Sequence, residues 1–198
     1  MSRSGICSDM RSWEFRILAA FVMGLTLSLA TAQPSLAKVL LTQEQALALA
    51  FPKDAEPERV TSYLTDEQAA RIKKEAGEAP PSNVLIWYKE GDTTAWFETH
   101  VVRTRRETIM IVVGGDGGVS RVDLLAFSEP DEYRPSSPWL QQFTGGKEGA
   151  DLSLRGRIRP ITGATLSARA IVAAVRRALA ARRILAVAGD GDGAEALP

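Results

Sequence analysis

Hydrophobic and polar residues follow two different periods along this chain, and the change falls near residue 84. Before that point, two segments have helical spacing. Each begins with a Thr that has a Gln three residues later, which is the pattern of a capping box. In Lys38–Ala50 this pair is Thr42 and Gln45, and a similar pair opens the segment Thr65–Gly77. We therefore predict two short helices in an N-terminal helical segment that covers residues 38–82.

From residue 84 the pattern becomes that of extended strands. Four segments are rich in β-branched and aromatic residues and are separated by short turn signals: Val84–Lys89, Thr94–Arg103, Glu107–Val113 and Val119–Phe127. The glycines between them favour tight hairpins, so we interpret Gly114–Gly118 as a turn and not as a phosphate loop, which would have to open a helix. In the last segment apolar and polar residues alternate, as expected when one sheet face is covered and the other is wet.

The clearest helical stripe lies in Leu166–Arg183, after a short helical piece at Trp139–Phe143. These patterns predict an α+β fold in which an antiparallel sheet of about four strands packs against a C-terminal helix, with the two short N-terminal helices beside it. The main domain is expected to span residues 83–185, and the Gly- and Asp-rich end, residues 186–198, is expected to be a disordered tail.

The N-terminal residues have the pattern of an export signal. Three arginines precede an uncharged apolar run, Ile17–Ala32, and small residues follow it at Ser35 and Ala37. The run is shorter than the roughly 20 residues of a membrane-spanning helix. We predict a signal peptide over residues 1–37, with Ala32 as a second cleavage position, and a periplasmic or other extracytoplasmic location. Residues 17–32 would act as a membrane anchor if the signal were not cleaved.

Composition limits the chemistry that the chain can perform by itself. Lys plus Arg and Asp plus Glu number 24 each, so a net charge of +0 gives no basic field for nucleic acid. A single cysteine, Cys7, and a single histidine, His100, exclude a Cys/His zinc site and a disulfide framework. Redox chemistry would therefore require a borrowed cofactor.

One loop has the features of a phosphate site. The residues Thr-Gly-Ala-Thr at 162–165 stand directly before the strong C-terminal helix. The first turn of a helix has unpaired backbone N–H groups and the positive end of the dipole, and both attract phosphate. Gly163 and Ala164 allow a bulky group to approach the backbone closely. A simple N-cap loop would also account for the two threonines.

The quartet, followed by Leu166 and Ser167 at the head of a C-terminal helix, resembles the flavinylation motif of FMN-binding domains. Such domains occur in the flavin-bearing extracytoplasmic subunits of Rnf and sodium-pumping NADH:quinone oxidoreductase complexes and in small exported relatives. The resemblance implies that a flavin transferase, with FAD as donor, links FMN through its phosphate to Thr165. The residues that match the rest of the recognition motif are Thr162, Gly163 and Ala164.

Four further residues are candidates around such a flavin. The family usually has Asp three residues before the quartet, where this chain has Arg159. Arg157 and Arg159 would neutralise a phosphate, or would belong to a solvated basic segment. His100 and Trp139 are candidates for the wall of a flavin site. The alternative for His100 is packing within a strand, and the alternative for Trp139 is a core residue that anchors its helix.

The resulting functional hypothesis is an extracytoplasmic FMN-binding electron-transfer protein. Its expected partners are the flavin transferase and membrane or periplasmic electron-transfer proteins, and we expect a carrier or a subunit of a redox chain more than a stand-alone enzyme. Two alternatives remain open. One is a non-redox exported ligand-binding module in which the Thr-Gly-Ala-Thr segment only caps a helix. The other is a small flavin-dependent reductase, for which the sequence has no second redox or nicotinamide site.

Overall fold

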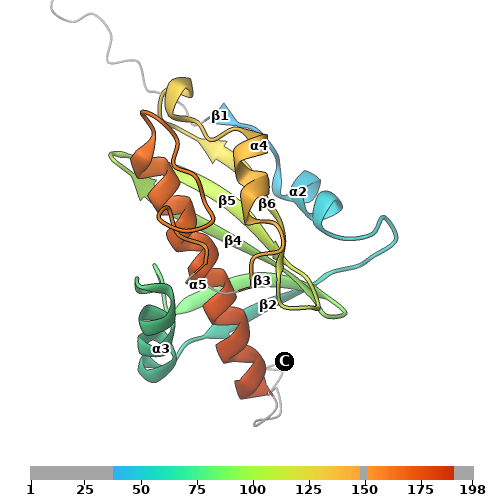
Figure 1. The fold of residues 1–198 in the computed structure, drawn as a ribbon. Helices are drawn as coiled ribbons and strands as arrows, with labels where there is room; N and C mark the ends of the chain where they lie inside the picture. Colours follow the sequence, from blue (N-terminus) through green and yellow to red (C-terminus); the bar gives the residue numbers. More distant parts are fainter. Residues whose placement is uncertain (1–37, 148–150, 190–198) are drawn as a thin grey trace, which may run out of the picture. The chain divides into compact units, whose positions relative to one another are not determined.

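The sheet defines the architecture in the computed structural model, which describes residues 38–147 and 151–189. Six antiparallel strands lie in the order β1-β6-β5-β4-β3-β2, and a long helix, α5 (Thr165–Gly189), crosses one face (Figure 1). The α+β class is therefore confirmed. The strands are β1 (Lys38–Val39), β2 (Glu58–Tyr63), β3 (Val84–Glu90), β4 (Thr93–Val102), β5 (Arg105–Val113) and β6 (Val119–Phe127).

The expected number of strands was wrong, because the sheet has six and not about four. The two additional strands lie at the two edges. β1 pairs only through Lys38 and Val39 with the end of β6, within a segment that we expected to be helical. β2 pairs with β3 along its whole length, and its sequence, ERVTSY, is mostly polar and exposed. Edge strands of this kind lack a strong apolar alternation, and the hydrophobic pattern therefore does not predict them.

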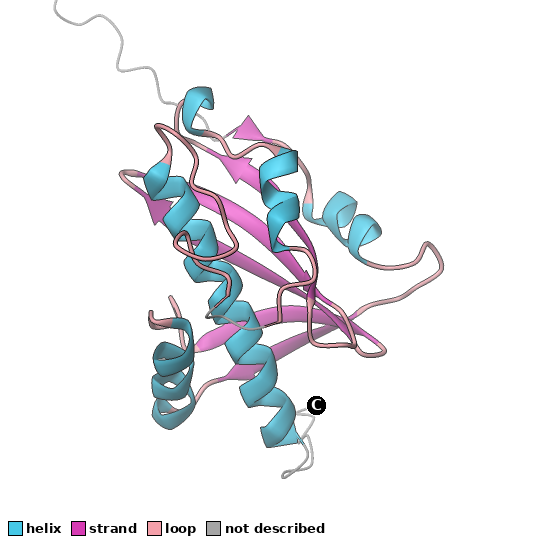
Figure 2. Ribbon diagram, viewed as in Figure 1, coloured by secondary structure: helices cyan, strands magenta, loops and turns pink. Residues whose placement is uncertain are grey.

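The helices other than α5 are short. They are α2 (Gln43–Ala50), α3 (Asp66–Ala76), the 3-10 helices η1 (Asp131–Tyr133) and η2 (Gln141–Phe143), and α4 (Ser137–Leu140) (Figure 2). Thr42 and Thr65 form capping boxes with Gln45 and Gln68, and Gly77 ends α3 in the left-handed conformation. α5 extends to Gly189, past the expected end of the domain at residue 185. In the described ranges no helix is long and apolar enough to cross a membrane.

Both faces of the central strands are covered, each by its own apolar cluster. In β5, Ile109, Ile111 and Val113 belong to the large cluster beneath α5. Met110 and Val112 point to the other face and pack with Ala46 and Phe51 at α2. The opposite face was expected to be wet, but α2 covers part of it. Double burial explains why β5 has a continuous apolar run instead of an alternating one.

The sheet opens between β3 and β4. These strands pair only from Trp87 opposite Trp96 to Glu90 opposite Thr93, whereas residues 84–86 pair with β2 alone. The two indole rings stack at this point, with centroids 5.0 Å apart. β2 and β3 therefore turn away from β4 (Figure 1). α5 lies against the opening, and α3 packs along the C-terminal part of α5.

Candidate functional site

Thr165 is the first residue of α5, and its side chain is exposed. The preceding loop turns sharply at Gly163, whose φ of +81° favours glycine, and nothing lies near the position of a Cβ atom there. Ala164 is buried, and its N–H donates to the carbonyl of Ile161 at 3.2 Å. Thr162 is exposed as well. The quartet therefore presents two hydroxyl-bearing residues to solvent on either side of a flexible glycine and a buried anchor.

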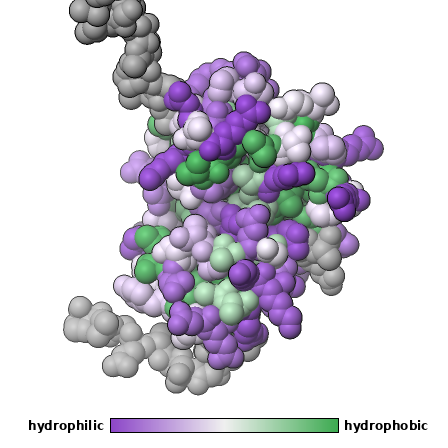
Figure 3. All heavy atoms as spheres, turned by 90° about the vertical axis from the view of Figure 1, so that its left-hand side faces the viewer, coloured by the Kyte–Doolittle hydropathy of each residue, from purple (hydrophilic) through white to green (hydrophobic). Residues whose placement is uncertain are grey.

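A cleft of about 440 Å³ begins at Thr165 and follows α5 towards the end of α3. Thr165, Arg169, Val172 and Arg176 recur at helical spacing and therefore form one stripe on α5 that lines it. The opposite wall comes from the end of α3 and from the loop 153–160. Its lining residues there are Ala76, Gly77, Glu78, Ser153, Leu154, Arg155 and Pro160. Figure 3 shows this side of the molecule, where hydrophobic and hydrophilic surface are interspersed.

The cleft is rich in positive charge. Arg155, Arg169 and Arg176 line it, with Glu78 as the only carboxylate among the lining residues. The guanidinium of Arg176 packs over Gly77, where an added Cβ would lie 3.8 Å from Nη2. Its Nη2 donates to the carbonyl of Glu75 at 3.4 Å, while its Nε is buried without a hydrogen-bond partner among the described residues. The donors suit a phosphate or an electron-rich heterocycle edge. Arg176 and Gly77 were not among the predicted site residues.

The residues that follow Thr165 face in different directions. Leu166 is about half exposed, at 46%, whereas Ser167 is buried. Both line a small hollow with Arg103 at the turn between β4 and β5, and the Arg103 guanidinium lies 4.6 Å from the ring centroid of Tyr133. Ser167 therefore belongs to the packing of the first helical turn against the sheet, and Leu166 lies at the surface beside Thr165.

Trp139 and Arg159 are in contact through the indole ring of the first and the backbone of the second. Trp139 is buried in the main core, edge-on to Phe143, and its Nε1 donates to the carbonyl of Arg159 at 2.6 Å. The Arg159 N–H donates to Oε1 of Gln142 at 2.9 Å, and the residue itself is exposed. Neither Trp139 nor Arg159 lines the cleft beside Thr165. The sequence does not point to Gln142, because an isolated Gln in a short helix gives no signal.

His100 lies beneath α5, on the sheet. Its Nδ1 is 3.5 Å from Oε1 of Glu98, and its Nε2 is 3.8 Å from Oε2 of Glu107 on the neighbouring strand. Neither ring nitrogen has a hydrogen-bond partner among the described residues. Burial raises the pKa of the Glu107 carboxyl to about 7, although His100 opposes the rise. His100 is not among the residues that line the cleft.

A buried ion pair ties the same region of the sheet to α5. Arg177 donates through Nε to Oε2 of Glu98 at 3.1 Å and through Nη2 to the other carboxylate oxygen, and its Nη1 donates to Glu78 at 2.8 Å. Burial alone would raise the pKa of Glu98, but the adjacent imidazole of His100 and guanidinium of Arg177 outweigh it and lower the pKa. The described residues hold no group of three or more His, Cys, Asp or Glu side chains suited to a metal ion.

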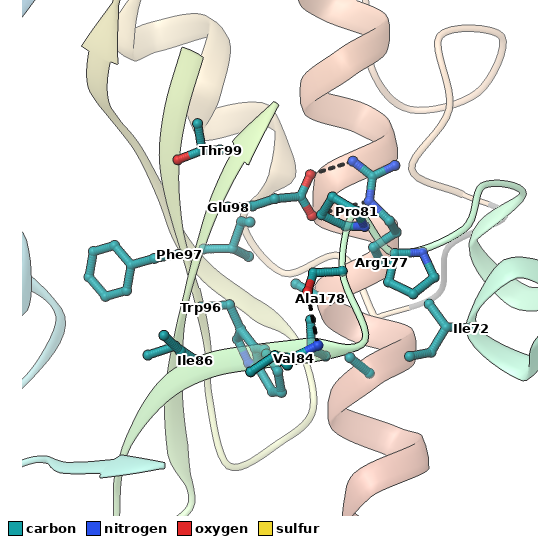
Figure 4. Close-up of a pocket in the computed structure, with 15 residues that line it drawn as sticks. Ile72, Pro81, Val84, Ile86, Trp96, Phe97, Glu98, Thr99, Arg177 and Ala178 are labelled. Atoms are coloured by element: carbon teal, nitrogen blue, oxygen red, sulfur yellow. Dashed lines mark hydrogen bonds and ion pairs between the residues drawn. The ribbon is translucent and has the colours of Figure 1, made fainter. Parts of the chain in front are cut away.

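A second, smaller pocket lies where β3 and β4 separate (Figure 4). Its volume is about 100 Å³, and apolar side chains such as Ile72, Trp96 and Ala178 surround it, with the Glu98–Arg177 pair at its edge. A cavity of about 150 Å³ accommodates a benzene ring. This pocket is therefore smaller than the three-ring system of a flavin requires.

Comparison with known families assigns the second half of the fold. Residues 106–180 match the family model described as FMN-binding domain, and in this segment the chain is similar to that family. The match covers β5, β6, α4, η2 and most of α5, and it includes Thr162 to Thr165. Searches among curated proteins and among solved structures give no match. The family supports FMN as the cofactor.

Proposed function

We propose that this protein is an exported electron-transfer protein whose FMN is attached by a phosphodiester to Thr165. The observation that supports attachment most directly is the position of the Thr165 side chain, exposed at the first residue of α5 and at the mouth of the basic cleft. An attached phosphate would lie near the unpaired N–H groups of the first helical turn, and the helix dipole would favour its negative charge.

The cleft beside Thr165 fits the rest of the cofactor. Its volume of about 440 Å³ is several times that of the pocket between β3 and β4, and only the larger one is lined by Thr165. Val172 and Ala173 provide an apolar floor, and Arg169 and Arg176 provide donors for carbonyl oxygens and ring nitrogens. The cleft residues would thus orient the ring system and shield part of it from water.

The attachment step balances without any further reactant. The Thr165 Oγ forms a bond to the phosphorus on the FMN side of FAD, the pyrophosphate bond breaks, and AMP leaves. A base of the flavin transferase takes the hydroxyl proton. The exposure of Thr165 suits this step, because the hydroxyl must enter the active site of another protein.

Once bound, FMN supplies the one- and two-electron chemistry, and the protein binds and orients it. The sequence and the described residues offer no nucleophile-and-base pair near Thr165, and this favours a carrier over an enzyme that turns over a substrate. The proposed location outside the cytoplasm rests on the signal-like residues 1–37, which lie outside the described residues. Covalent attachment would prevent the loss of the cofactor by dilution there.

The test is export of the full chain from cells with and without a flavin transferase, followed by intact-mass measurement and in-gel flavin fluorescence after denaturation. We expect an added mass of FMN less one water with the transferase, and no addition to Thr165→Ala. Thr104→Ala, which removes an exposed hydroxyl at the β4–β5 turn, is the matched control and should be labelled normally. Labelling of Thr165→Ala, or no labelling of the unmodified chain with the transferase, would refute the proposal.

A further inference from the structure

The loop that leads to Thr162 is docked on the α4–η2 segment, although the two are joined through residues outside the described ranges. Leu152 is fully buried and packs on Gly146, where an added Cβ would lie 2.5 Å from its Cδ2. The guanidinium of Arg157 donates to the carbonyl of Thr144. The loop therefore makes apolar and polar contacts with one continuous surface.

That surface is itself fixed to the sheet. Gly145 N–H donates to the carbonyl of Val119 at 2.7 Å, and Val119 N–H donates to the carbonyl of Gly146 at 2.8 Å, so the segment pairs with the start of β6. Phe143 is fully buried in the main core and meets Trp139 at a ring-centroid distance of 5.4 Å. Any group held by α4 and η2 is consequently held in the frame of the sheet.

Three hydrogen bonds close a ring among Trp139, Gln142 and Arg159. The Trp139 indole donates to the Arg159 carbonyl at 2.6 Å, and the Arg159 N–H donates to Gln142 Oε1 at 2.9 Å. Gln142 Nε2 donates in turn to the Trp139 carbonyl at 3.2 Å, and this orients the amide so that its oxygen faces Arg159. Both backbone groups of Arg159 are thus held, whichever side chain stands at that position.

We propose that Trp139 and Gln142 are positioning residues that hold the quartet at residues 162–165 in the conformation that the flavin transferase accepts. The inference rests on the proposed function. The quartet lies between two anchors, the fixed backbone of Arg159 and the first turn of α5, where Ala168 N–H donates to the Ala164 carbonyl at 3.1 Å. Pro160 restricts the backbone immediately after the first anchor. Release of that anchor would free the backbone at Arg159, three residues before a quartet that turns at Gly163.

The two hydrogen bonds that Trp139 and Gln142 make to the backbone of Arg159 form a backbone clamp. The proposal predicts that the rate of FMN attachment depends on this clamp more than on the side chain at position 159. Gln142→Leu removes the acceptor for the Arg159 N–H, and Trp139→Phe removes the indole donor but keeps an aromatic ring in the core. Gln142→Glu keeps an acceptor oxygen for the Arg159 N–H but loses the amide donor to the Trp139 carbonyl. Gln141→Leu, at the exposed neighbouring position, is the matched control. Arg159→Asp keeps both backbone groups and should leave the clamp intact.

The experiment measures the initial rate of FMN addition to each purified chain at fixed concentrations of flavin transferase and FAD, together with amide hydrogen exchange of residues 158–164. We expect Gln142→Leu and Trp139→Phe to lower the rate by up to about tenfold, as the loss of one hydrogen bond allows, and to speed exchange at the Arg159 amide. Gln142→Glu, which keeps only one of the two hydrogen bonds of the Gln142 amide, should give a rate at or above that of Gln142→Leu, and Gln141→Leu should match the unmodified chain.

The outcomes separate this inference from the proposed function. If the unmodified chain is labelled and Gln142→Leu is labelled at the same rate, the positioning role is refuted while the attachment site stands. If Trp139→Phe does not fold, the rate measured for Gln142→Leu tests the positioning role, because Gln142 lies outside the apolar core. A rate that falls in Gln141→Leu as much as in Gln142→Leu would also refute the positioning role. No labelling of the unmodified chain would refute the proposed function first.

Discussion

Replacing Glu107 by Gln should change how the stability of the protein depends on pH. Glu107 is 1% exposed, neither of its carboxylate oxygens has a hydrogen-bond partner among the described residues, and its Oε2 lies 3.8 Å from Nε2 of His100. Burial raises its pKa from the ordinary value of 4.5 to about 7, while the charge of His100 opposes the rise and that of Glu129 adds to it. The folded protein therefore holds this proton more tightly than the unfolded chain does.

The direction of the effect follows from proton linkage. Between pH 4.5 and 7 the folded state binds more protons than the unfolded state, so the free energy of unfolding falls as the pH rises through that window. The full contribution of this proton to the free energy of unfolding is about 3 kcal/mol, and about 2 to 3 kcal/mol of it is lost between pH 5 and pH 8. Glu107→Gln keeps the shape of the protonated carboxyl and removes the titration.

The assay is urea denaturation of both chains at pH 5 and at pH 8. We expect the variant to gain about 2 to 3 kcal/mol relative to the unmodified chain on going from pH 5 to pH 8. The same substitution at the exposed Glu90 serves as the control and should show no such gain. Parallel pH profiles for Glu107→Gln and the unmodified chain would show that the buried carboxyl does not carry this proton.

Two further substitutions test the packing of α5 on the sheet and the contact between Gly146 and Leu152. Arg177→Met should lower the free energy of unfolding by about 3 to 5 kcal/mol in chemical denaturation, because it leaves the Glu98 carboxylate buried without its partner. Arg183→Met, at a half-exposed arginine, should lower the free energy of unfolding by less than about 1 kcal/mol. Equal losses in the two variants would contradict the conclusion that Arg177 is the partner of a buried carboxylate. Gly146→Ala should lower the melting temperature, because its Cβ would meet Leu152 at 2.5 Å, and an unchanged value would show that Leu152 moves away freely.

The four strands from β3 to β6 and the start of α5 were predictable because their residues have strong local signals. The glycines of the segment 114–118 join β5 and β6 as a turn, as expected, with Gly117 at a φ of +80°. The sequence did not predict the sharp separation of β3 from β4, which depends on α3 and α5 packing beside the sheet. It also did not predict the cover that α2 gives to Met110 and Val112.

The site shows the same division. Thr165 was predictable because a short motif stands at the start of a strong helix, and the structure places it at the first residue of α5. The wall of the cleft could not be predicted from the sequence, because Gly77 and Arg155 reach it from distant parts of the chain. The relation between Trp139 and Arg159 was hidden for a similar reason, since it joins an indole N–H to a backbone carbonyl 20 positions away.

The central claim is that Thr165 carries the flavin, and mass spectrometry of a tryptic digest tests it most directly. After coexpression with a flavin transferase, fragmentation of the peptide Ile158–Arg169 distinguishes its three hydroxyl-bearing residues, Thr162, Thr165 and Ser167. We predict an addition of FMN less one water on Thr165. An unmodified peptide, or the same addition on Thr162 or Ser167, would contradict the account.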